Sequence, residues 1–139
     1  MHLKMLDFFL GTGKEFTLEA MEISKKLTQE AGLSVFREGE SADHFFVLLK
    51  GRIRLTVGQT GSEVYVARNK GEIFGWSCLI GRETYSASAE CLEPTDLLRF
   101  DRESFLRILE RYPANEALIY RRIAETLGNR LLELYPTIS

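Results

Sequence analysis

Seven glycines divide the middle of the chain into short segments, and this division limits what the chain can fold into. They lie between Leu33 and Phe100, at positions Gly39, Gly51, Gly58, Gly61, Gly71, Gly75 and Gly81. Glycine marks turns because it adopts backbone conformations that other residues avoid. Many short strands separated by frequent turns predict a mainly β architecture, either a sandwich or a roll.

The segments between the glycines have the pattern of strands. Arg52–Val57 alternates with a period of two, and Ile53, Leu55 and Val57 form its apolar face. Lys50 and Gly51 join it tightly to the preceding apolar segment, so we expect these two segments to form a β-hairpin. The predicted strands are His44–Leu49, Arg52–Val57, Glu63–Arg68, Thr84–Cys91 and Thr95–Phe100.

Helical patterns flank the strand region. Thr17–Ala31 carries an apolar stripe, and Gly32 is a natural stop after it. Asp101 is a predicted N-cap for a helix over Arg102–Arg111. Pro113 fits the first turn of a last helix, which is predicted to end near Tyr135. We expect one domain over residues 1–139, made of an N-terminal helical segment (1–32), a β-roll (33–100) and C-terminal helices (101–135).

The last predicted helix carries a stripe of apolar residues at spacings of three and four. Its members are Ala117, Tyr120, Ala124, Leu127, Leu131 and Leu134. They form a coiled-coil-like seam about two and a half heptads long. The stripe could pack on the strands of its own chain. It could instead pair with a second copy to form a homodimer, with Ile119 and Ile123 facing the roll.

The composition limits the classes of function. The net charge of −2 argues against nucleic-acid binding through a large basic face. No stretch approaches the roughly 18 apolar residues of a membrane span, and the N-terminus lacks a signal-peptide pattern. We therefore expect a cytoplasmic protein without a membrane partner, in which Cys78 and Cys91 stay reduced. His2 and His44 are too few for most histidine-based metal sites, so no metal site is predicted.

One constellation, Gly71–Gly81 followed by Tyr85–Ala89, suits the binding of an anion. Gly75 allows a sharp turn, Trp76–Ile80 can form a short helix, and Gly81 can end it. The N-terminus of a helix presents free N–H groups and the positive end of a dipole, which favour a phosphate.

Side chains around this short helix add polar groups. Ser77 and Ser86 are possible hydroxyl donors. Thr84, Ser86, Ser88 and Glu90 share one strand face, which suits either solvent or a ligand cavity. Cys78 lies where the pKa of a thiol tends to fall, but a small buried packing residue is the favoured interpretation.

Several segments together resemble a known family. Phe36–Asp43 followed by a strand, and then Leu49–Leu55, resemble the opening of the cyclic-nucleotide-binding domain of catabolite-activator and FNR-type regulators, protein kinase A regulatory subunits and gated channels. Gly71–Ala89 is similar to its phosphate-binding cassette, and the closing helices look like its B and C helices. The resemblance runs from about Thr17 to Tyr135. It implies a double-stranded β-helix, a jelly-roll-like β-roll, with a regulatory role.

The cassette departs from the family pattern at two positions. The family has a Glu that binds the ribose 2′-hydroxyl and an Arg that pairs with the cyclic phosphate. Here Trp76 stands at the Glu position and Tyr85 at the Arg position. A charged hydrogen bond contributes roughly 1.5–3 kcal/mol, so losing the Arg weakens phosphate binding. Arg130 lies near the base-contacting position of the last helix. The resemblance implies cAMP, cGMP or another small anion as ligand, with candidate binding residues Gly75, Trp76, Ser77, Cys78, Thr84, Tyr85, Ser86, Ala87, Ser88 and Arg130.

Three functions follow from this sequence. The first is a sensor that binds a small anionic or nucleotide ligand in the altered cassette and signals through its last helix. The second is a ligand-free interaction module, in which Trp76 and Tyr85 fill the pocket and the last helix forms a dimer. The third, an enzyme on a similar roll such as a cupin, is disfavoured because the histidine cluster for a metal is missing. No catalytic residue is predicted.

We expect no direct contact with DNA. Ser139 follows Tyr135 by four residues, which leaves no room for a helix-turn-helix after the last helix. The sequence leaves open a stand-alone sensor and a piece of a longer regulator. The arginines of the last helix are balanced by glutamates on the same helix, as expected for a solvated face: Arg121, Arg122, Arg130, Glu116, Glu125 and Glu133.

Overall fold

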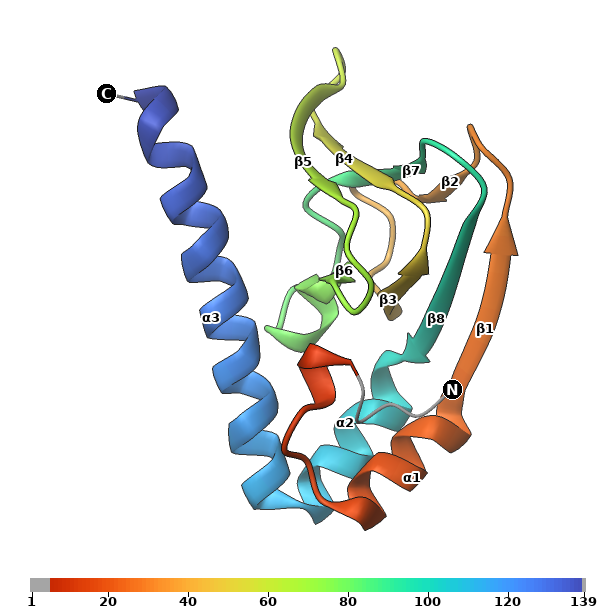
Figure 1. Cartoon of the computed structure of the whole chain (residues 1–139), viewed down its shortest axis with the longest axis vertical. Coiled ribbons are helices and arrows are strands. Elements are labelled where there is room, and N and C mark those ends of the chain that lie inside the picture. The colour runs from red at the N-terminus through yellow and green to blue at the C-terminus, as the bar shows by residue number, and fades with distance from the viewer. Residues whose placement is uncertain (1–5, 139) are drawn as a thin grey trace.

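Two antiparallel sheets of four strands form the body of the molecule, with helices at one end and along one side (Figure 1). This computed structural model describes residues 6–138. The strand orders are β1-β8-β3-β6 and β2-β7-β4-β5. Both sheets contribute to one hydrophobic cluster, for example through Phe45 and Leu55. The predicted fold class, mainly β with flanking helices, is confirmed.

The elements have the following bounds in chain order. The helical elements are η2 (Asp7–Phe9), α1 (Lys14–Ile23), η3 (Trp76–Leu79), α2 (Arg102–Arg111) and α3 (Pro113–Ile138), where η marks a 3-10 helix. The strands are β1 (Ser24–Gln29), β2 (Ser34–Phe36), β3 (His44–Lys50), β4 (Ile53–Val57), β5 (Ser62–Ala67), β6 (Ile73–Phe74), β7 (Ser88–Cys91) and β8 (Thr95–Asp101).

The junction between β8 and α2 follows the prediction. Helix α2 has the predicted bounds, and the Asp101 carboxylate accepts the backbone N–H of Ser104 as an N-cap. The aromatic core fastens this helix to the sheet. Phe45 stacks on Phe100 with ring centres 4.8 Å apart, and Phe105 of α2 meets Phe45 edge-on at the same separation. The end of the roll that carries α2 is therefore firmly packed.

The predicted helix over Thr17–Ala31 is wrong in its second half. Helix α1 ends at Ile23, and the next six residues form strand β1. Every residue of β1 has a partner on β8, from Ser24 opposite Phe100 to Gln29 opposite Thr95. This pairing overrides the helical spacing of the apolar side chains. Within the N-terminal segment predicted as helical, the described residues 6–32 are therefore part helix and part strand.

The predicted hairpin between the strands that flank Gly51 is also wrong. β3 pairs with β6 and β8, whereas β4 pairs with β5 and β7 in the other sheet. Gly51 therefore carries the chain from one sheet to the other. Its φ is +108°, and a Cβ there would lie 2.4 Å from Thr95 Oγ1. Only glycine fits this crossing, so the glycine signal was correct and the predicted connection was not.

Several predicted bounds change by a few residues. Only Ser88–Cys91 of the predicted strand Thr84–Cys91 belongs to a sheet, while Thr84 makes an isolated bridge with Ser41. The short cassette helix is a 3-10 turn that ends at Leu79, and β5 begins and ends one residue earlier than predicted.

The last helix, α3, is longer than predicted and reaches Ile138 through Pro136. Ile119 and Ile123 are buried and pack into the core, as expected if the seam beside them faces away from the roll. Leu131 and Leu134 of the seam are 52% and 47% exposed, whereas Tyr120 and Leu127 are partly buried against the core. Dimer formation through the seam stays a prediction.

Candidate functional site

The sharp turn of the cassette lies where β6 leaves its sheet. Gly75 follows β6 in the left-handed conformation, with φ at +74°, and turns the chain into η3. Its missing side chain matters as much as its φ. A Cβ there would lie 3.0 Å from Phe36 and 3.2 Å from Phe46. Gly75 therefore lets two aromatic rings approach the cassette backbone closely.

Tyr85 is turned inward rather than toward a ligand space. Its side chain is 5% exposed, and its ring stacks on Phe36 with centres 3.8 Å apart and planes 14° apart. Its hydroxyl donates to the carbonyl of His44 at 2.6 Å and accepts the N–H of His44 at 3.2 Å. Burial raises the pKa of Tyr85 to about 12, so the phenol stays protonated. Stacking and two hydrogen bonds hold the ring in place.

The space left in the cassette is small. A cavity of about 40 Å³ is lined by six predicted site residues and by Phe36 and Leu55. Because about 10–15 Å³ is enough to hold one water, such a cavity has room for only a few waters. Trp76 is half-buried, and the Ser77 and Ser86 hydroxyl oxygens lie 3.4 Å apart. The six predicted residues are Gly75, Trp76, Ser77, Tyr85, Ser86 and Ala87.

Four other predicted site residues do not line this cavity. Cys78 is buried with its thiol pointing back to the carbonyl of Gly75, and burial raises the pKa of the thiol to about 12. A raised pKa favours the neutral thiol, and the side chain is packed in the core. Thr84 is exposed. The Ser88 hydroxyl accepts the backbone N–H of Glu38 at 3.0 Å.

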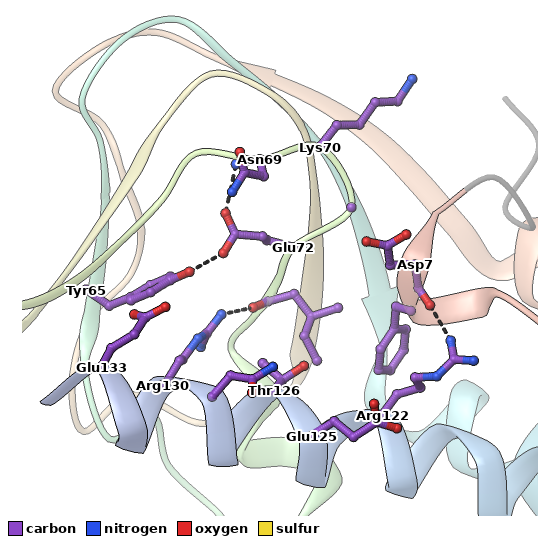
Figure 2. Close-up of a pocket in the computed structure, with 14 residues that line it drawn as sticks. Asp7, Tyr65, Asn69, Lys70, Glu72, Arg122, Glu125, Thr126, Arg130 and Glu133 are labelled. Carbon is purple, nitrogen blue, oxygen red and sulfur yellow. Dashed lines mark hydrogen bonds between the residues drawn. The ribbon is translucent and has the colours of Figure 1, made fainter. Parts of the chain in front are cut away.

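Arg130 is the fourth, and it lines a different and larger cavity, of about 390 Å³, between α3 and the β5–β6 connection (Figure 2). There its guanidinium donates to the carbonyl of Ile73 at 2.8 Å. The guanidinium carbon lies 4.2 Å from the centre of the Tyr65 ring. Arg130 thus contacts the backbone of Ile73, near the start of the cassette segment, and does not line the small cassette cavity.

Phe36, Leu55 and Tyr65 were missed by the sequence prediction. Phe36 is 49 positions from Tyr85 in the sequence, and Tyr65 is 65 positions from Arg130. Such pairs are brought together by the sheets. The apolar residues before Arg37-Glu38-Gly39 were the available signal for Phe36, but they point to a strand and not to a ring partner for Tyr85.

Residues 6–138 offer neither a metal site nor a membrane span of the kinds considered next. Side chains of His, Cys, Asp and Glu do not gather there in groups of three that could hold a metal ion. None of the helices in that range is both long and apolar enough to cross a membrane.

Known proteins resemble this chain in sequence. The model of the cyclic nucleotide-binding domain family matches residues 27–112. The cyclic AMP receptor protein of Thermus thermophilus is 27% identical over 133 residues, which cover 94% of this chain and 60% of that protein. Two Mycobacterium tuberculosis proteins are 33% identical over 81 residues, or 58% of this chain and 16% of each relative. The chain therefore spans only part of the curated relatives it matches.

Solved structures resemble it in fold and cover most of the chain. A Geobacter metallireducens protein described as cyclic nucleotide-binding superposes with a TM-score of 0.83 at 25% identity, covering 93% of this chain and 95% of that one. The Thermus thermophilus catabolite activator protein gives 0.75 at 26% identity, covering 94% and 62%. The family model covers more than half of the sequence, and these structures share its architecture. The chain belongs to the cyclic nucleotide-binding domain family.

Proposed function

We propose that this chain is a regulatory domain whose cassette is closed by its own Tyr85, and that it acts through contacts of its last helix without binding a cyclic nucleotide in the cassette. The observation that carries the proposal is the stacking of Tyr85 on Phe36, with both hydrogen-bonding groups of its hydroxyl used by the His44 backbone. This is the second of the functions predicted from the sequence. We favour it over the first function, a sensor that binds a ligand in an altered cassette.

The size of the cavity supports this choice. Small-molecule sites usually measure about 300–1,000 Å³. The cassette cavity, at about 40 Å³, is far below that range. A nucleotide would first have to displace Tyr85, which breaks the stack and leaves the His44 backbone without its partners. Breaking these interactions costs about 2–4 kcal/mol, which lowers the affinity by roughly 30- to 700-fold.

The last helix is the surface that we propose for regulation. Its seam is open toward solvent at Ala117, Ala124, Leu131 and Leu134. Burying such a stripe against a second copy gains about 25 cal/mol for each Å² of apolar surface. The arginines of α3 are engaged with their own chain. Arg121 pairs with Glu125, and Arg122 donates to the carbonyl of Asp7, which does not favour a DNA contact.

We also propose a non-enzymatic role in the cytoplasm. Cys78 and Cys91 are buried and unpaired, which suits a reducing compartment. The neutral thiol of Cys78 leaves the cassette without an activated nucleophile.

Cyclic AMP and cyclic GMP are the natural probes for the test. One relative is by name a cyclic AMP receptor protein, and another, from Caenorhabditis elegans, is a cGMP-dependent protein kinase. A ligand at 100 times its Kd adds about 2.7 kcal/mol to the free energy of unfolding. We expect neither nucleotide to raise the melting temperature or to change the fluorescence of Trp76. The Thermus receptor serves as a positive control, and a saturable response of this chain would overturn the proposal.

A double variant tests the physical cause. Trp76→Glu with Tyr85→Arg restores the two charges of the family pattern and removes the ring that fills the cassette. We expect cyclic AMP or cyclic GMP to raise the melting temperature of this variant, which no longer contains a tryptophan, while the melting temperature of the wild type stays unchanged. Tyr135→Arg, which changes an exposed tyrosine on α3, is the matched control and should gain no binding. If the melting temperature of the double variant also stays unchanged, Trp76 and Tyr85 are not the reason that the cassette binds no nucleotide.

A further inference from the structure

Helix α3 is fastened to the rest of the chain unevenly. Its first half contributes Ile119 and Ile123 to the core, and Leu127 packs partly against it. After Leu127 the exposure changes. The next large apolar side chains are 47–58% exposed, namely Leu131, Leu132, Leu134 and Tyr135. Burial therefore positions the first half of the helix but contributes little to the position of the last turns.

A cavity, and not packed side chains, lies beside the middle of α3. The space of about 390 Å³ is bounded by α3, by η2 and by the connection between β5 and β6. Figure 2 shows side chains reaching across it from the helix. Arg122 spans one end, toward the carbonyl of Asp7, and Arg130 spans the other.

Arg130 makes two contacts with the roll, each from a different strand. It donates to the carbonyl of Ile73 in β6, and it lies over the ring of Tyr65 in β5. Tyr65 is itself held, because its hydroxyl donates to the carboxylate of Glu72. A planar guanidinium can hydrogen-bond and cover an aromatic face at the same time, which a lysine cannot do equally well.

Hydrogen bonds of Glu72 and Ile73 connect the Arg130 contact to the backbone around the cassette turn. Besides Tyr65, the Glu72 carboxylate accepts the N–H groups of Arg68 and Asn69 at 2.8 and 2.7 Å, so it fixes the turn before β6. Ile73, which accepts from Arg130, is two residues before Gly75, where the cassette turns. The last turns of α3 and the start of the cassette therefore share one network of contacts.

A glycine interrupts α3 just before this contact. Gly128 is exposed, and a Cβ at this position would meet no atom within 4 Å. Glycine in a helix interior is less favourable than alanine by about 1 kcal/mol, and packing gives no reason for it here. It therefore marks a weak point between the packed part of the helix and the part that Arg130 holds.

We propose that Arg130 is a latch, and Gly128 a hinge, that together set the position of the last turns of α3 relative to the roll. The inference rests on the proposed function, in which α3 is the regulatory surface. With the latch closed, Leu131 and Leu134 have one fixed orientation relative to the earlier part of the seam. With the latch open, those turns bend at Gly128, and the far end of the seam loses that orientation.

Spin labels test the latch directly. One label replaces Thr60, exposed in the β4–β5 turn, and the other replaces Leu132, exposed on α3. The native cysteines are buried, so they leave labelling to the engineered sites. Labelled chain is diluted with excess unlabelled chain so that distances within one molecule dominate. We expect a narrow distance distribution in the parent and a broader, shifted one after Arg130→Gln.

Two further variants complete the experiment. Arg121→Gln removes the same charge from an exposed residue of α3 and should leave the distribution unchanged. Gly128→Ala, added to Arg130→Gln, removes the hinge and should narrow the distribution again. Hydrogen exchange gives a second measurement without labels. The amides of residues 131–135 should exchange about tenfold faster after Arg130→Gln, while those of β3 and β8 stay as in the parent.

Equal distance distributions and equal exchange rates in the parent and in Arg130→Gln would overturn the latch. This result is independent of the test of the proposed function. Nucleotide binding by the wild type would overturn the closed cassette while leaving the latch measurable. A latch that fails in a chain that binds no nucleotide would leave the closed cassette standing.

Discussion

At the scale of single residues, Tyr85 links the cassette to the core. Tyr85→Phe keeps the ring on Phe36 but removes the hydroxyl that pairs with both backbone groups of His44. Leaving such groups unpaired costs about 1–3 kcal/mol, so we expect a loss of that size in the free energy of unfolding. Urea denaturation measures it. Tyr135→Phe on exposed α3 should change stability by less than about 0.5 kcal/mol. Equal effects of the two variants would contradict the role given to the Tyr85 hydroxyl.

Three protonated groups make stability depend on alkaline pH. Burial raises the pKa of Cys78, Tyr65 and Tyr85 to about 12, from ordinary values of 9.0 for the thiol and 10.0 for the phenols. Each group holds its proton more tightly in the folded state. Its contribution is complete below the unfolded pKa and is lost as pH rises through the folded value. We expect the melting temperature to fall between about pH 9 and 12, and to fall less steeply in Cys78→Ala. A melting temperature that stays level to pH 12 would contradict this prediction.

At the scale of elements, the cap of α2 is the most separable interaction. The Asp101 carboxylate accepts both the N–H and the hydroxyl of Ser104, and the N–H bond is the first cause of its lowered pKa. Asp101→Ala should cost about 1 kcal/mol, the usual value of an N-cap. Asp101→Asn, which can still accept these bonds, should restore most of the loss. Because the folded pKa is depressed, the wild-type cap should be lost only as pH falls through that value. Thermal unfolding from pH 7 to pH 3 measures both effects.

Elements defined by local chemistry were predictable, and those defined by distant partners were not. The cap, the proline at the start of α3 and the spacing of α2 are readable within a few residues, and the structure confirms them. Strand β1 depends on β8, about 70 residues away, and the glycine at position 51 gives no sign of which sheet follows it. In the cassette, too, local features were predictable and contacts between distant residues were not. Its turn and glycines follow from the sequence, whereas the stacking of Tyr85 on Phe36 depends on how β2 lies beside β7.

At the scale of the whole molecule, different sides of α3 face different surroundings. Successive residues of a helix are about 100° apart, so Arg130 lies on the side of Ile119 and Ile123, toward the roll. The seam residues lie on another side, where Ala117, Ala124, Leu131 and Leu134 are exposed and Tyr120 and Leu127 are partly buried against the core. The large cavity is lined by Arg130 together with further α3 residues outside the seam, such as Asn129 and Glu133. A second copy on the seam would therefore leave both the latch and the cavity uncovered.

The separation of these faces gives a sharp test of the dimer. Ala124→Glu places a carboxylate in the middle of the seam, where two copies would bring two such charges together in an apolar interface. We expect the wild type to be a dimer by light scattering, and Ala124→Glu to be monomeric, or at least tenfold weaker in association. Leu132→Glu introduces the same charge on the same helix, one residue past Leu131 and therefore about 100° away from it. It should remain dimeric, because Leu132 is 58% exposed and lies off the seam. Dissociation by both variants alike would show that net charge, and not the seam, controls assembly, and a monomeric wild type would remove the seam as an interface.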